Sequence, residues 1–243
     1  MNYDIVIPTH RTQEATKQCL NNIACLMSNL RIILIDNGNE EDFFETPWLI
    51  RIPSAENLGF IKATNMGIAR STAPYIVLQN SDTLIFNNIY DKMAKVFEQD
   101  SQVGVVGTIF SPSPCWQSIN NLPQWGMDKY RGTDAEIAAQ ISKDYAGQWQ
   151  EVGGMVAFAC VMIKREVIQN CGYLSERFGV GFGDDDEYCW RVQKAGYKVA
   201  VAKDCYIWHG HRTTFKQLYS EAEIEQMGLD NIRLFKKMTR GEI

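Results

Sequence analysis

Short runs of consecutive apolar residues alternate, along the first 110 positions, with segments whose apolar residues recur every three or four positions. The runs have the length of buried strands, and the wider spacing is that of amphipathic helices. Strands are predicted at 3–8, 31–35, 49–52, 75–78 and 103–110, and helices at 12–30, 61–70 and 88–99. This alternation indicates an α/β fold, a mostly parallel central sheet with flanking helices in a single domain.

Beyond residue 110 the pattern becomes irregular before it turns regular again. The stretch 111–150 contains three prolines and three of the six tryptophans, and only 134–142 has helical spacing. Such a segment can line a binding cleft, or its tryptophans can anchor an excursion on the solvent side; the sequence leaves both open. Further strands are predicted at 155–163 and 198–202, and further helices at 164–170, from 184 through about 195, and within 215–238.

Composition narrows the classes of protein to consider. The chain has 243 residues, a hydrophobic content of 45% and a net charge of −5, as expected for a globular protein without a general basic surface for nucleic acid. No apolar run approaches the ~20 residues that span a bilayer, and the first residues do not resemble a signal peptide. Seven cysteines without a Cys-x-x-Cys pair favour reduced thiols in a cytoplasmic protein.

Polar residues follow the first four predicted strands at the point where each strand ends. They are Thr9, Asp36, Asn57 and the segment 80–82. In open α/β sheets ligands bind outside the carboxyl ends of the strands. We therefore expect these side chains to meet in one crevice.

Two of these positions carry candidate chemistry. Asp82 offers a carboxylate of the kind that holds Mg²⁺ or Mn²⁺, although Asn-Ser-Asp is also ordinary turn sequence. His209 and His211 flank a glycine after a late strand, which suits a loop that reaches a metal or a phosphate. They lie too close together, without a cysteine pair, for a structural zinc site.

Four adjacent carboxylates at 184–187 follow a glycine-rich loop and begin a predicted helix. A helix start accounts for one or two of them, because acidic side chains suit the free N–H groups there. Repulsion between neighbouring carboxylates raises their pKa values and makes them stronger proton acceptors. The turn is therefore a candidate general base.

Six segments, in order, resemble the family-two glycosyltransferases of GT-A fold. They are VIPT at 6–9, LIDN at 34–37, NLGF at 57–60 with NMG at 65–67, LQNSD at 78–82, GDDDEYCWR at 183–191 and WH at 208–209. The resemblance implies transfer of a single sugar from a nucleoside-diphosphate sugar to an acceptor hydroxyl with inversion. It also implies a nucleotide-sugar-binding half at 1–110, an acceptor-binding and catalytic half at 111–215, and a C-terminal helical segment at 216–243.

The resemblance also implies roles for particular residues. Asp82 would bind a divalent cation, Mn²⁺ or Mg²⁺, with His209 as a second ligand or a diphosphate contact. Asp185 would be the base, with Asp184 as the alternative. Residues around the donor would be Thr9, Asp36, Asn57, Gly59, Asn80 and Ser81.

Asn80 stands where the family carries the first acidic residue of its Asp-x-Asp motif, a variation that resembles the rhamnosyl- and galactofuranosyl-transferase branch. The Gln-x-x-Arg-Trp element and membrane helices of processive synthases are absent from the sequence. We expect an enzyme of surface-glycan or lipid-linked saccharide assembly, in the cytoplasm or at the membrane periphery. The alternatives are a phage-type enzyme that glycosylates hydroxylated DNA bases, a non-catalytic sugar-nucleotide-binding protein and a nucleotidyltransferase.

Overall fold

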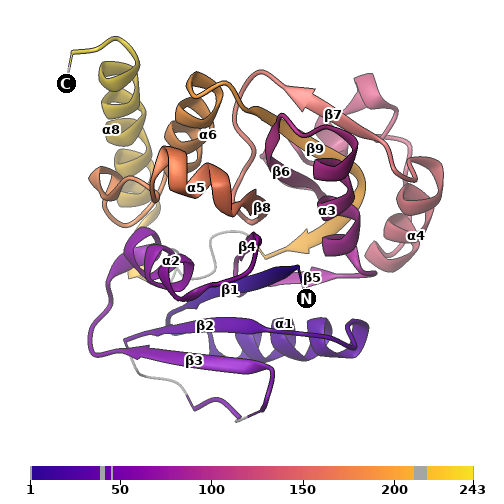
Figure 1. The fold of residues 1–243 in the computed structure, drawn as a ribbon, viewed down its shortest axis with the longest axis horizontal. Helices are drawn as coiled ribbons and strands as arrows, with labels where there is room; N and C mark the ends of the chain where they lie inside the picture. The colour runs from indigo at the N-terminus through magenta and orange to yellow at the C-terminus, as the bar shows by residue number, and fades with distance from the viewer. Residues whose placement is uncertain (1, 39–41, 45, 211–217, 243) are drawn as a thin grey trace.

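A computed structural model describes residues 2–38, 42–44, 46–210 and 218–242, and shows a nine-stranded mixed sheet flanked by helices (Figure 1). The strands are β1 (Tyr3–Thr9), β2 (Ile32–Asn37), β3 (Leu49–Ser54), β4 (Tyr75–Gln79), β5 (Thr83–Ile85), β6 (Val103–Phe110), β7 (Trp149–Val152), β8 (Cys160–Lys164) and β9 (Lys198–His209). The helices are α1 (Gln13–Leu26), α2 (Gly59–Arg70), α3 (Ile89–Gln99), α4 (Asp134–Asp144), α5 (Arg165–Cys171), α6 (Asp184–Lys194) and α8 (Glu221–Thr239).

The strand order is β3-β2-β1-β4-β8-β6-β9-β5, with β7 paired to β9. β1 to β4 form a parallel group, β8 is antiparallel to both β4 and β6, and β9 is parallel to β6. The parallel group brings the carboxyl ends of β1, β2 and β4 to one edge of the sheet, where ligands bind in open α/β folds. The predicted α/β class is confirmed.

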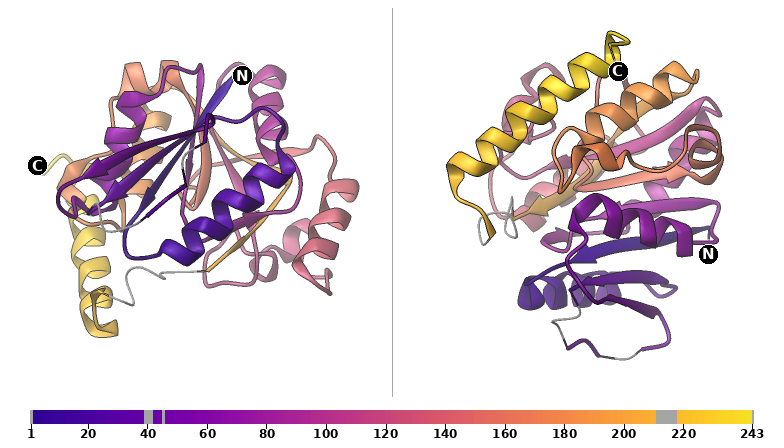
Figure 2. Two further views of the ribbon diagram at one scale, coloured as in Figure 1. Left: turned by 90° about the horizontal axis from the view of Figure 1, so that it is seen from below. Right: turned by 90° about the vertical axis from the view of Figure 1, so that its left-hand side faces the viewer.

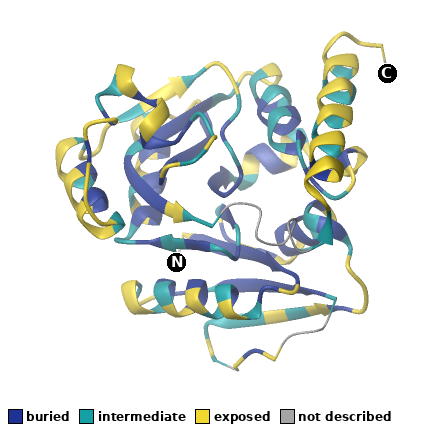
Figure 3. Ribbon diagram, turned by 180° about the vertical axis from the view of Figure 1, so that it is seen from behind, coloured by how far each residue is buried: buried dark blue, intermediate teal, exposed yellow. Residues whose placement is uncertain are grey.

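Two apolar layers cover the two faces of the sheet, and the central strands are buried between them (Figure 3). Side chains of β1 alternate between the layers, because successive residues of a strand point to opposite faces. Val6 belongs to the layer that contains α2 and α6, whereas Ile5 and Ile7 belong to the layer that contains α1 and α3. The alternation fixes the register of β1, and with it the position of Thr9 at its end.

The helix α2 lies close to the sheet because of a glycine. A Cβ atom at Gly67 would lie 2.2 Å from Cγ1 of Val6, so only glycine fits between this helix and β1. Asn65, on the same helix, bonds both the N–H and the C=O of Leu174. Asn65 and Gly67 of the NMG segment therefore hold α2 in position, and neither lines the cleft described below.

Several predicted boundaries are wrong. The strand predicted at 155–163 begins only at Cys160, and the N–H of Ala157 bonds the side chain of Gln117 instead of a strand. The strand predicted at 198–202 continues to His209, and β5 and β7 were not predicted. Both missed strands have four residues or fewer, too few to show a period.

The tryptophans of 111–150 anchor this segment. The Trp116 indole N–H donates to the carbonyl of Met155 at 3.1 Å, and its ring meets Trp125 edge to face. Trp149 lies within β7. In the described residues no helix is both long and apolar enough to cross a membrane.

Candidate active site

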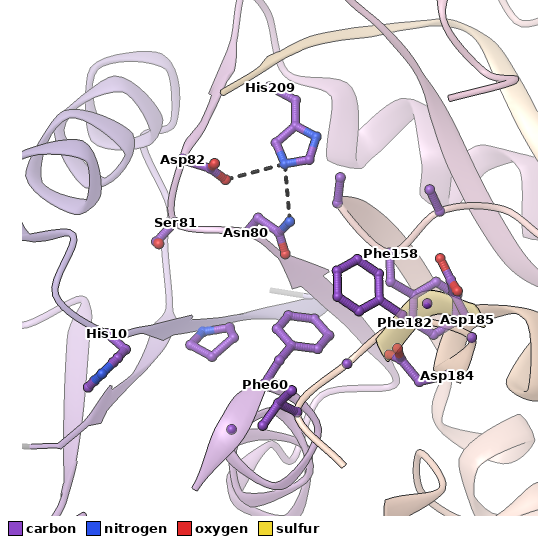
Figure 4. Close-up of a pocket in the computed structure, with 18 of the residues that line it drawn as sticks. His10, Phe60, Asn80, Ser81, Asp82, Phe158, Phe182, Asp184, Asp185 and His209 are labelled. Carbon is purple, nitrogen blue, oxygen red and sulfur yellow. Dashed lines mark hydrogen bonds and ion pairs between the residues drawn. The ribbon is translucent and has the colours of Figure 1, made fainter. Parts of the chain in front are cut away.

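A cleft of about 500 Å³ opens at the carboxyl ends of β1, β2 and β4, and the loop before α6 forms its opposite wall (Figure 4). Most of the predicted site residues line it, although they come from widely separated segments. They are Thr9, Asn57, Gly59, Asn80, Ser81, Asp82, Asp184, Asp185 and His209. Of the strand-end positions expected to meet in one crevice, Thr9, Asn57 and residues 80–82 line this cleft.

Asp82 and His209 form a pair at one end of the cleft. Oδ1 of Asp82 lies 3.3 Å from Nε2 of the histidine, and the Asn80 amide nitrogen lies 3.2 Å from the same ring atom. Pairing of β5 with β9 produces this contact, because Thr83, next to Asp82, stands opposite His209. His211, the other histidine considered beside Asp82, lies outside the described residues.

The chemistry of this pair fits a divalent cation. Carboxylate oxygen and imidazole nitrogen are ligands that Mn²⁺ accepts, and Oδ1 of Asn80 is buried without a hydrogen-bond partner in the described part of the chain. No group of three or more His, Cys, Asp or Glu side chains gathers as a metal site among the described residues. Beside this pair, phosphate oxygens and water are further ligands that suit such a cation.

Asp36 is placed differently from the other predicted binding residues. It lies at the end of β2 as expected, but its carboxylate accepts hydrogen bonds from Nη2 of Arg51 at 2.5 Å and from Nε at 3.0 Å. Arg51 belongs to the adjacent strand β3. Asp36 is buried and does not line the cleft, so its contact with a donor stays a prediction.

Hydroxyl groups beneath the cleft tie two of its walls together. Oγ1 of Thr9 lies 3.1 Å from that of Thr12 and 2.7 Å from that of Thr16. Thr12 in turn lies 3.2 Å from the hydroxyl of Ser81. This chain of hydrogen bonds links the end of β1 to the loop that carries Asp82. Thr9 and Ser81, the two predicted site residues with hydroxyl groups, therefore also help to hold that loop in position.

Two lining residues, His10 and Asn37, were not identified from the sequence. The Asn37 amide donates to Asn57 at 2.9 Å and accepts from the N–H of Leu58 at 2.7 Å. The carbonyl of Asn37 lies 2.5 Å from Nδ1 of His10, and a carbonyl can only accept, so that ring nitrogen carries the proton. His10 directly follows Thr9, and Asn37 directly follows Asp36. Because Thr9 and Asp36 are predicted at strand ends, this adjacency is the signal in the sequence that points to the two residues.

The acidic turn forms the opposite wall of the cleft from the Asp82–His209 pair (Figure 4). Its backbone reaches α6 through three consecutive residues with positive φ, Gly181 at +149°, Phe182 at +70° and Gly183 at +78°. Asp184 is 4% exposed and Asp185 is half-buried. Glu187 points away, into a 2.7 Å ion pair with Arg191. The turn therefore contributes Asp184 and Asp185 to the cleft, while Glu187 supports the helix.

Burial sets the proton affinity of this turn. It raises the pKa of Asp184 to about 6, and it raises the pKa of Asp185 well above its usual value, with the charges of Asp184 and Asp186 adding to the effect. Burial also raises the pKa of Asp186. Carboxyls whose pKa is raised toward neutrality are effective proton acceptors. The cleft thus has a carboxylate and an imidazole in contact on one wall, and buried carboxyls with raised pKa values on the other.

Comparison with known proteins gives the site a context. The family model "Glycosyltransferase like family 2" matches residues 2–228. Glycosyltransferase GlyG of Streptococcus pneumoniae serotype 4 is 27% identical over 212 residues, which cover 82% of this chain and 67% of the relative.

Solved structures are similar in fold at low identity. The mannosyltransferase PcManGT of Pyrobaculum calidifontis, in complex with GDP-Man and Mn²⁺, matches with a TM-score of 0.57 and 16% identity over 86% of this chain and 56% of that one. TarS residues 1–349 of S. aureus, in complex with UDP-GlcNAc, match with a TM-score of 0.61 and 12% identity over 97% and 65%. This chain therefore spans a little over half of PcManGT and just under two thirds of that TarS chain.

Proposed function

The chain belongs to the family-2-like glycosyltransferases and has their GT-A fold, and from that premise we propose that it transfers one sugar from a nucleoside-diphosphate sugar to an acceptor hydroxyl with inversion. The observation that carries this proposal is the division of the cleft. Its cation-type pair, Asp82 and His209, and its carboxyl pair, Asp184 and Asp185, lie on opposite walls.

The donor belongs at the wall formed by the strand ends. Two solved relatives of this fold contain a nucleotide sugar, GDP-Man in one and UDP-GlcNAc in the other, and the first also contains Mn²⁺. In this chain Asp82 and His209 would hold such a cation, with the amide oxygen of Asn80 beside them. A bound divalent cation stabilises the charge of a departing diphosphate. Asn37 and Asn57 line the same side of the cleft, where we expect the rest of the donor, and the hydrogen bond between their amides holds both in place.

The acceptor belongs at the wall formed by the acidic turn. We assign the general base to Asp185, because both residues line the cleft and Asp185 is the more exposed of the two. It takes the proton of the acceptor hydroxyl as that oxygen attacks the anomeric carbon. Attack from this wall, opposite the leaving diphosphate, forms one bond as the other breaks and inverts the configuration. Burial raises the pKa of both carboxyls, which strengthens this role.

The proposed acceptors are sugars of surface glycans or lipid-linked saccharides. Within the family, we propose that this chain belongs with the rhamnosyl- and galactofuranosyl-transferase branch. Asn80, in place of an acidic residue, supports that branch. A thermal-shift screen of UDP-, dTDP- and GDP-sugars with Mn²⁺ identifies the donor. A donor that binds the folded state raises the melting temperature, and the increase grows with the logarithm of its concentration divided by its Kd.

The base assignment is tested with Asp185→Asn, which keeps the size of the side chain and removes its basicity. We expect transfer to fall by about 10²- to 10⁴-fold, the range typical of general base catalysis, while the affinity for the donor stays the same. Asp128→Asn is the control, because this carboxyl is exposed and does not line the cleft. Near-normal transfer by Asp185→Asn would show that another group is the base.

A further inference from the structure

The side chain of Asn231 reaches three backbone carbonyls of the loop that precedes the acidic turn. Its amide nitrogen lies 2.9 Å from the carbonyl oxygen of Phe178, 2.8 Å from that of Gly181 and 3.0 Å from that of Phe182. A side-chain amide has two hydrogens to donate, so it shares them among the three acceptors. One residue of α8 thus satisfies much of the hydrogen bonding of a loop that is distant in sequence.

The loop needs such support because of its backbone conformation. Phe182 has a φ of +70°, a region in which a side chain with a Cβ is strained by about 1–2 kcal/mol. Gly183 follows at +78°, where a Cβ would lie 3.3 Å from the ring of Phe178. A strained conformation persists only when its surroundings hold it in place. Asp184 and Asp185 come directly after these residues, so the loop conformation decides where their carboxyls point.

Asn231 is itself held firmly. Figure 2 shows α8 running alongside α6, and the Phe235 ring meets the Trp190 ring of α6 edge to face. Leu234, Phe235 and Met238 pack against the apolar layer on that face of the sheet. The family match ends at residue 228, before Asn231, although α8 continues to Thr239. The contact therefore lies in the part of the helix that the family model does not include.

We propose that Asn231 is a positioning residue, which holds the 178–183 loop so that the Asp185 carboxyl faces the acceptor hydroxyl. This inference rests on the proposed function, because it gives the loop its purpose. Displacement of a reacting group by about 1 Å can lower a rate by about 100-fold. The three hydrogen bonds of one amide therefore make α8 part of the catalytic unit.

The test compares Asn231→Leu, which keeps the number and branching of the side-chain heavy atoms and removes the donor, with Gln226→Leu. Gln226 is an exposed amide on the same helix, and it bonds Asp230 instead of the loop. For Asn231→Leu we expect kcat for transfer to fall about 10- to 100-fold, with the KM for the donor within about twofold of wild type. Hydrogen exchange of the ligand-free protein should accelerate at 178–186 and not in the central sheet. Gln226→Leu should change neither quantity.

A double-mutant comparison separates positioning through the base from other effects. If Asn231 acts only through Asp185, Asn231→Leu lowers kcat in the wild-type background and produces no further loss in Asp185→Asn. An equal loss in both backgrounds, unchanged exchange at 178–186, or acceleration spread over the whole sheet would overturn the proposal. Full activity of Asp185→Asn alone would refute the base assignment instead, and the exchange measurement would still report whether Asn231 holds the loop.

Discussion

Replacing Asp184 by Asn would remove a carboxylate whose ionisation the folded state opposes. The side chain is 4% exposed, and burial together with the charges of Asp186 and Glu187 raises its pKa. In the unfolded chain the same carboxyl loses its proton at a lower pH. Between these two pKa values the folded state binds more protons than the unfolded state, so its stability decreases as the pH rises.

The magnitude follows from the size of the shift. The pKa moves from 3.8 to about 6, and each pKa unit corresponds to about 1.4 kcal/mol. Ionised Asp184 therefore destabilises the fold by about 3 kcal/mol once the pH lies above both values. About half of this change, some 1.5 kcal/mol, falls between pH 5 and pH 8. The Asp184→Asn variant does not undergo this loss of stability, because its amide does not titrate.

Urea unfolding at pH 5 and pH 8 measures the effect. The free energy of unfolding of Asp184→Asn, relative to wild type, should rise by about 1.5 kcal/mol from the lower to the higher pH. Asp128→Asn is the control, since Asp128 is exposed and its replacement should have the same effect at both pH values. A difference between Asp184→Asn and wild type that is constant with pH, or that shrinks at pH 8, would refute the assignment of a raised pKa to this buried carboxyl.

Two further predictions concern the cation and the packing of α2. EDTA should abolish transfer, and Mn²⁺ or Mg²⁺ should restore it, because Asp82 and His209, which lie 3.3 Å apart, are the proposed ligands of a cation that the reaction needs; activity that is indifferent to the chelator would contradict the metal assignment. Gly67→Ala should destabilise the fold by about 1–3 kcal/mol, because its Cβ would overlap Val6. In thermal unfolding the control Gly228→Ala, which has no atom within 4 Å of an added Cβ, should melt no lower than wild type.

The positions of the strand ends could be predicted from the sequence, because the pattern of apolar residues is enough to locate buried parallel strands. Thr9 and Asn57 line the cleft as expected, and so does Asp82, which follows β4. Asp36 is also at its predicted strand end, but its hydrogen bonds come from Arg51, one strand away. Whether a carboxylate pairs with a neighbouring strand or faces a ligand depends on side-chain direction, which apolar periodicity does not encode.

Contacts that depend on irregular or distant segments do not follow from the periodicity of apolar residues, and the approach of His209 to Asp82 is expected only through the resemblance to a known family. His209 reaches Asp82 because β5, a strand of only three residues, pairs with the end of β9. Asn231 lies in the middle of a helix, where an asparagine gives no signal of a tertiary contact. Its three acceptors are carbonyls, and their positions follow from the fold and not from the residue types that carry them.

The length of β9 has a consequence for how this protein is assembled. This strand of 12 residues pairs with β5, β6 and β7, and it ends at His209, which lies 129 positions from its contact Asn80. Pairings between such distant segments form late, because loop closure costs entropy before the contacts offset it. During synthesis β5 and β6 must wait for this partner with open hydrogen-bonding edges, a state prone to aggregation. Asp82 and His209, the proposed cation pair, therefore come together only after β9 has been synthesised and has joined the sheet.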